Sequence, residues 1–82
     1  MKKVIEKIIN RAKWNLKMRD ANNQLAEQER ELHHWKNATM YEGFADQFQS
    51  AFMEDVNIYG AIQDLDWMDA CKELHRLADN YQ

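Results

Sequence analysis

The chain of 82 residues contains no proline, only two glycines and a single cysteine, Cys71. The residues that most often interrupt a helix are therefore absent or rare. A single cysteine excludes a disulfide within the chain and is typical of a reducing compartment. A domain this short buries only about 60–65% of the surface that its unfolded chain exposes. Its core is thin, so we expect a partner, either a second copy or another protein, to complete it.

Long apolar runs are also absent, and no segment of the sequence resembles a membrane span. The opening "MKKVIEKIINRAKW" is charged but lacks the apolar region and the small-residue cleavage site of a signal peptide. We therefore expect a cytoplasmic protein.

Alanine, leucine, glutamate, glutamine, lysine and arginine are common, and neither strand alternation nor an internal repeat is visible. This composition predicts an all-α fold, a single helical domain over residues 1–82. We expect a long or broken N-terminal helix over about 2–37, followed by two shorter helices over about 40–55 and 61–79.

Two local signals set these boundaries. "TMYE" has the pattern of a capping box, with Thr39 as the cap and Glu42 three residues later. "NIYG", residues 57–60, is the next predicted break, because it contains one of the two glycines.

The first helical segment carries two apolar stripes on opposite sides. One stripe comprises Val4, Ile5, Ile8, Ile9, Ala12 and Leu16. The other comprises Trp14, Met18, Ala21, Leu25, Leu32 and Trp35, and Gln28 interrupts it. Two explanations remain open: the helix breaks at "RDANNQ", residues 19–24, or one long helix buries different faces at its two ends.

Apolar side chains at helical spacing also predict the cores of the later helices. The middle helix should bury Tyr41, Phe44, Phe48 and Phe52. Replacing Phe48 by alanine should then cost about 3–5 kcal/mol. The last helix should bury Ile62, Leu65, Cys71, Leu74 and either Leu77 or Ala78, with Trp67 and Met68 on its flanks.

Charge is sorted along the chain. Residues 1–19 carry seven basic and one acidic side chain, whereas residues 37–71 carry seven acidic side chains and no lysine or arginine. The acidic segment is a solvated face, a complement to the basic end, or a mimic of a nucleic-acid backbone. We favour complementarity, within the chain or between copies, because seven carboxylates over 35 residues are sparse for mimicry.

Residue patterns that bind metals or perform catalysis are incomplete. The segment Asp55–Asp66 aligns with a calcium loop, but Tyr59 and Asp66 are poor ligands at two of its positions. Cys71 and His75 lie four residues apart without the further ligands that zinc needs or the oxyanion site that a catalytic cysteine needs. We expect no catalytic residue, metal or cofactor, and no enzymatic activity.

Trp14 is the strongest candidate for binding a partner. It lies opposite the isoleucine stripe, among the basic residues Lys3, Lys7, Arg11 and Lys17. An exposed tryptophan in such a place indicates a surface that something covers. These five residues form the predicted partner-binding site.

In length and overall character, a chain that opens "MKKVIEKIINRAKWNLKMRDANNQLAEQERELHHWK" resembles the cytoplasmic lysis-inhibition antiholins of T-even coliphages. No diagnostic motif carries this resemblance, so it assigns no functional residue. It implies a bacteriophage protein in the host cytoplasm that binds the cytosolic segment of a holin and delays lysis.

Three functions are therefore considered. The first is the antiholin, a non-enzymatic protein–protein interaction that reaches the membrane surface only through its partner. The second is a phage-type inhibitor of a nucleic-acid-acting host enzyme, which would use the acidic segment. The third is a structural helical oligomerisation module. We expect a homo-oligomer and no binding of nucleic acid, because the chain has no recognised nucleic-acid-binding motif and the acidic segment would repel phosphate.

Overall fold

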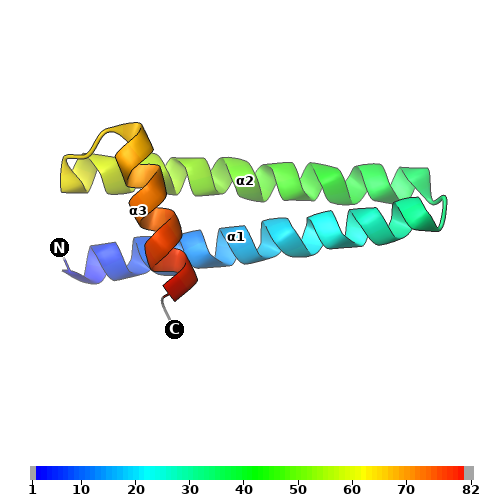
Figure 1. Cartoon of the computed structure of the whole chain (residues 1–82), viewed down its shortest axis with the longest axis horizontal. Coiled ribbons are helices and arrows are strands. Elements are labelled where there is room, and N and C mark those ends of the chain that lie inside the picture. Colours follow the sequence, from blue (N-terminus) through cyan, green and yellow to red (C-terminus); the bar gives the residue numbers. More distant parts are fainter. Residues whose placement is uncertain (1, 81–82) are drawn as a thin grey trace.

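The structure is a computed structural model that describes residues 2–80. Nearly all of them lie in three helices: α1 (Lys2–Glu31), α2 (Trp35–Gln63) and α3 (Trp67–Asn80). No strand occurs among the described residues. The predicted all-helical class, with a long first helix followed by two shorter ones, is confirmed (Figure 1).

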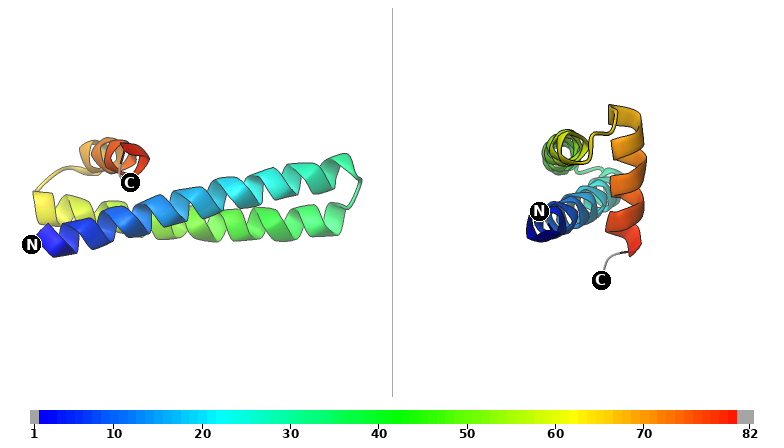
Figure 2. Two further views of the ribbon diagram at one scale, coloured as in Figure 1. Left: turned by 90° about the horizontal axis from the view of Figure 1, so that it is seen from below. Right: turned by 90° about the vertical axis from the view of Figure 1, so that its left-hand side faces the viewer.

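Helices α1 and α2 form an elongated antiparallel hairpin, joined by a short turn at residues 32–34 (Figure 1). Helix α3 crosses one face of this hairpin, near the start of α1 and the end of α2 (Figure 2). The molecule therefore has a proximal half of three helices and a distal half of two, over a length of 47 Å.

Helix α1 is continuous, so the possible break at residues 19–24 does not occur. Asn22, which lies in this segment, is buried, and its Nδ2 donates a hydrogen bond to the Met18 carbonyl at 2.8 Å. A side chain satisfied in this way does not compete with the helix. The helix ends at Glu31 rather than near residue 37, and His33 in the turn has a positive φ of 59°.

The predicted capping box at Thr39 is wrong, because α2 already begins at Trp35. The Thr39 hydroxyl donates to the Trp35 carbonyl at 3.0 Å, as threonine does inside a helix. Glu42 pairs with Arg30 of α1 instead of reaching back to the backbone. Helix α2 therefore starts five residues before the predicted Met40.

The predicted break at "NIYG" is also wrong, because α2 continues to Gln63. Gly60 lies inside α2 against α3: a Cβ built on it would be 3.1 Å from the Ala70 Cβ. This glycine permits close helix packing and does not end a helix. Helix α2 ends in the left-handed Asp64, with a φ of 55°. Helix α3 follows at Trp67, and Asp66 accepts a hydrogen bond from the Asp69 N–H at 2.8 Å.

The core lies in the proximal half, where all three helices meet. Its buried residues are Ile8, Ile9, Ala12, Leu16, Phe52, Val56, Tyr59, Ala70, Leu74 and Ala78. The isoleucine stripe is therefore largely buried as predicted, although Val4 is exposed.

The aromatic stripe of α2 is buried only at one end. Phe52 is fully buried and stacks against His75, with ring centroids 4.6 Å apart. Tyr41 and Phe48 are half-buried, and Phe44 is exposed, because α3 does not reach the distal half. The prediction that Phe48 fills the core is wrong, and Phe52 takes that role. In the C-terminal part, Leu74 and Ala78 are buried, whereas Ile62, Leu65, Cys71 and Leu77 are half-buried beside the core.

Candidate protein-binding site

Trp14 lies on the outside of α1 with 56% of its surface exposed. It lines an open hollow of about 330 Å³ together with Asn10, Arg11, Asn15 and Ala51. Because Ala51 belongs to α2, the hollow follows the groove between the two long helices. A large aromatic side chain beside such a hollow is a feature of surfaces that a partner covers.

A buried carboxylate lies next to this hollow. Asp55 of α2 is fully buried, and its Oδ2 accepts a hydrogen bond from Asn15 Nδ2 at 2.8 Å. Its Oδ1 has no hydrogen-bond partner but lies 3.3 Å from Arg11 Nη2, an ion pair with a largely exposed guanidinium. Burial raises the pKa of Asp55 above its usual 3.8, against the opposing effects of Asn15 and Arg11. This ion pair joins the basic and acidic segments within the chain.

The other predicted site residues divide between two sides of α1. Helical spacing places Lys3 and Lys7 on the same side as Trp14, and both are exposed. Arg11 lines the Trp14 hollow itself. Lys17, however, lines a different hollow, which also includes Ala78 and Asp79 of α3. The structure therefore groups Lys3, Lys7, Arg11 and Trp14, and it places Lys17 toward α3.

Four residues of this site were not predicted from the sequence: Asn10, Asn15, Ala51 and Asp55. Asn15 falls between the two apolar stripes of α1, and the sequence pointed to Asp55 only as a carboxylate of the acidic segment and as the first residue of the supposed calcium loop. Their hydrogen bond links positions 40 residues apart, which no local pattern indicates.

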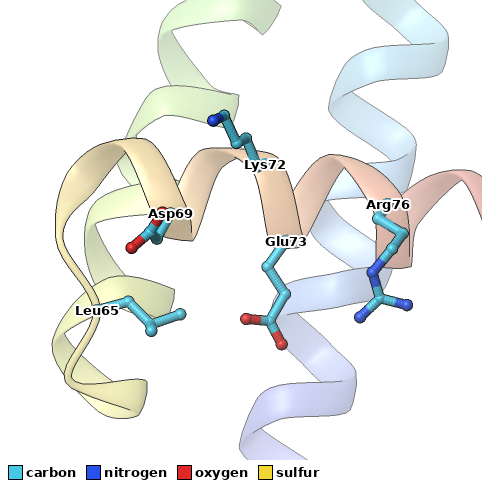
Figure 3. Close-up of a pocket in the computed structure, with 5 residues that line it drawn as sticks. All are labelled: Leu65, Asp69, Lys72, Glu73 and Arg76. Atoms are coloured by element: carbon cyan, nitrogen blue, oxygen red, sulfur yellow. The ribbon is translucent and has the colours of Figure 1, made fainter.

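A further hollow lies along α3 and is lined by Leu65, Asp69, Lys72, Glu73 and Arg76 (Figure 3). In this view, Glu73 and Arg76 extend to the same side of α3, whereas Lys72 points the other way (Figure 3). Burial raises the pKa of Tyr59 to about 12, and its hydrogen bond with Glu73 adds to this effect. Because acidic and basic side chains alternate around the hollow, it has no electrostatic preference for an anionic or a cationic ligand.

The fold gives other surroundings to the residues that were considered for metal binding and catalysis. Asp55, the first residue of the supposed calcium loop, is buried in α2, and the segment stays helical to Gln63. His75 stacks on Phe52, and Cys71 beside it is half-buried. Within residues 2–80, no three histidine, cysteine or acidic side chains are grouped so that they could hold a metal ion.

No protein-family model, no curated protein and no solved structure matches this chain. Among the described residues, no helix has the length and apolar character needed to cross a membrane.

Proposed function

We propose that this chain is a non-enzymatic binding protein, and that it acts as an antiholin by binding the cytosolic segment of a phage holin. The observation that supports binding most directly is the exposed Trp14 beside Arg11 in the groove between α1 and α2. Tryptophan and arginine are the residues most often found as anchors of protein interfaces. The choice of a holin as the partner comes from the resemblance of the sequence.

Charge around Trp14 favours an acidic or amphipathic partner segment. Lys3, Lys7 and Arg11 lie along the same side of α1 as Trp14, so they would attract negative charge toward the hollow. Of these three cations, Arg11 forms an ion pair with the buried Asp55. By binding more tightly to the holin before it forms a hole than afterwards, the chain would delay lysis, because a ligand shifts an equilibrium only by its differential affinity.

The acidic segment gives less support to an inhibitor of nucleic-acid enzymes. Of its seven carboxylates, Asp55 is buried and Glu42 pairs with Arg30. The remaining charges are too few to imitate the regular phosphate spacing of a nucleic acid, which places one charge about every 1.7 Å of a duplex.

The test is the affinity of the full chain for a synthetic peptide with the sequence of the holin's cytosolic segment. Trp14→Ala should weaken binding by about thirtyfold or more and leave the circular dichroism spectrum unchanged. Trp67→Ala is the matched control, since Trp67 is also exposed but lies on α3, and it should bind like the unmodified chain. Equal affinities for both variants would show that the Trp14 hollow is not the site.

A further inference from the structure

Asp55 is the only charged side chain that is buried among residues 2–80. Burying a carboxylate costs free energy unless its charge and its hydrogen bonds are compensated. The hairpin requires only one acceptor oxygen here, because Asn15 Nδ2 donates its hydrogen bond to Oδ2. A neutral amide would supply that oxygen equally well. The fold therefore gains nothing from the negative charge of Asp55 except the ion pair with Arg11.

The ion pair of Asp55 and Arg11 spans the groove between the two long helices. Asp55 belongs to α2 and Arg11 to α1, and Asp55 Oδ1 lies 3.3 Å from Arg11 Nη2. The Arg11 side chain is 59% exposed, although the carboxylate is fully buried. A guanidinium carries five N–H donors in a rigid plane. The buried end of this ion pair therefore fixes a donor group that is itself exposed at the surface.

The exposed guanidinium lies beside an aromatic surface. Arg11 and Trp14 line the same hollow, and Trp14 follows Arg11 by three residues, so their side chains occupy neighbouring turns on one side of α1. Asn10 and Asn15 add uncharged amides to this hollow. An occupant that matches the hollow combines an apolar side chain, which packs on Trp14, with an acceptor oxygen, which receives hydrogen bonds from Arg11.

Charge at the hollow itself is balanced. Arg11 is paired with Asp55, and Glu54, the preceding residue of α2, is exposed and adds a further negative charge nearby. The other basic residues of this side, Lys7 and Lys3, lie one and two turns farther along α1. Long-range attraction of an acidic partner segment therefore comes from Lys3 and Lys7, whereas at the point of contact an uncharged carbonyl oxygen suits Arg11 better than another carboxylate.

We propose that Asp55 is a positioning residue, which holds the Arg11 guanidinium beside Trp14 so that Arg11 donates hydrogen bonds to a carbonyl oxygen of the partner segment. This inference rests on the proposed function, because it concerns the same hollow. Arginine loses conformational freedom when a partner immobilises it, and an arginine that is already held loses less. A partner that covers the hollow also excludes water, which strengthens the ion pair of Arg11 and Asp55 in the complex.

Affinity and stability should separate in Asp55→Asn. The amide keeps an acceptor for Asn15 but has no charge to hold Arg11. The dissociation constant of this variant for the holin peptide should rise by about fivefold, while the urea midpoint of the free chain at neutral pH does not fall. Glu54→Gln, which removes a charge from the exposed neighbouring position, should change the dissociation constant by less than about twofold. Unchanged or tighter binding by Asp55→Asn would overturn the proposal.

A double-mutant cycle shows whether Asp55 acts through Arg11. In an Arg11→Ala background, Asp55→Asn should cause no further loss of affinity, because no guanidinium remains to be held. An equal loss in both backgrounds would mean that Asp55 only supports the fold. A second peptide, in which asparagine and glutamine replace the acidic residues, tests the acceptor. The effect of Asp55→Asn should persist with this peptide, and its disappearance would refute a carbonyl acceptor.

The ion pair itself can be measured without a partner. An NMR titration of the Asp55 side chain should give a higher pKa in Arg11→Ala than in the unmodified chain, because the Arg11 guanidinium favours the charged form of the carboxyl group. An identical pKa in the two chains would overturn the positioning of Arg11 by Asp55. If the unmodified chain does not bind the holin peptide, the proposed function fails, and this titration still decides whether Asp55 holds Arg11.

Discussion

Asn15 of α1 donates a hydrogen bond to Asp55 of α2 at 2.8 Å, and this buried contact crosses the hairpin beside the Trp14 hollow. Asp55 is fully buried, and its only cationic neighbour among the described residues, Arg11, is largely exposed. The free-energy cost of desolvating the carboxylate is therefore offset only by one hydrogen bond and a weak ion pair.

The stability of the chain should accordingly depend on the charge of Asp55. Burial raises its folded pKa above the unfolded value of 3.8, so the fold favours the protonated form. The contribution of Asp55 to the free energy of unfolding is favourable below pH 3.8 and is lost as the pH rises through the folded pKa. Asp55→Asn, which keeps the shape and stays neutral, should raise the free energy of unfolding at neutral pH by about 1 kcal/mol.

Urea denaturation at neutral and acid pH measures this effect, with Asp46→Asn as the control for the same loss of charge at an exposed position of α2. The advantage of Asp55→Asn should disappear in acid, and Asp46→Asn should show almost none. A loss of stability in Asp55→Asn at neutral pH would mean that the ion pair with Arg11 outweighs the cost of burial.

Tyr59 should make the fold sensitive to alkali. Its pKa is raised from 10.0 to about 12, chiefly by burial, so its contribution to stability is complete below pH 10 and declines as the pH rises toward 12. Replacing it by phenylalanine should flatten the decline in unfolding free energy over that interval. Thermal melting of Tyr59→Phe and of Tyr41→Phe, in which the hydroxyl is lost from a half-buried residue of the distal half, provides the comparison. Parallel alkaline profiles for Tyr59→Phe and the unmodified chain would contradict the assignment.

The two glycines should respond in opposite directions to replacement by alanine. A Cβ on Gly60 would be 3.1 Å from the Ala70 Cβ and 3.2 Å from the Leu65 carbonyl oxygen, so Gly60→Ala should destabilise the fold by about 1–3 kcal/mol. A Cβ on Gly43 meets nothing within 4 Å, and Gly43→Ala should stabilise α2 by about 1 kcal/mol. Denaturation midpoints measure both, and a neutral Gly60→Ala would show that α3 can shift without cost.

Leu74 and Leu77 of α3 provide a matched test of the core. Leu74 is fully buried among residues of all three helices, whereas Leu77 packs at its margin. Leu74→Ala should cost about 2–5 kcal/mol through the cavity that it leaves, and Leu77→Ala should cost clearly less. If calorimetry gives equal losses for the two variants, the margin of the core is more tightly packed than the burial indicates.

The helical class and the isoleucine stripe could be predicted because both depend on local composition and spacing. The capping box at Thr39 was misleading because threonine and glutamate three residues apart also occur within a helix. The hydrogen bond from the Thr39 hydroxyl to the Trp35 carbonyl shows that α2 has already begun there. The break predicted at Gly60 was wrong for a similar reason. The role of this glycine is set by Ala70, which belongs to a different helix in the sequence but packs next to Gly60 in space.

The candidate site was predictable in part. The exposure of Trp14 follows from its position opposite the isoleucine stripe, and helical spacing alone groups it with Lys3 and Lys7. The pair of Asn15 and Asp55 could not be found, because their contact depends on the register of the hairpin. Phe48 and Phe52 occur in the same stripe, and only the position of α3 decides which of them is buried.

The placement of α3 also bears on how the chain folds as it is synthesised. Leu74 and Ala78 belong to the same buried core as Ile8 and Phe52, but they leave the ribosome after both long helices. Translation proceeds at about 5–20 residues per second, so the nascent hairpin spends a second or more with its aliphatic core open to solvent. Helix α3 therefore completes the core only after both long helices have been synthesised.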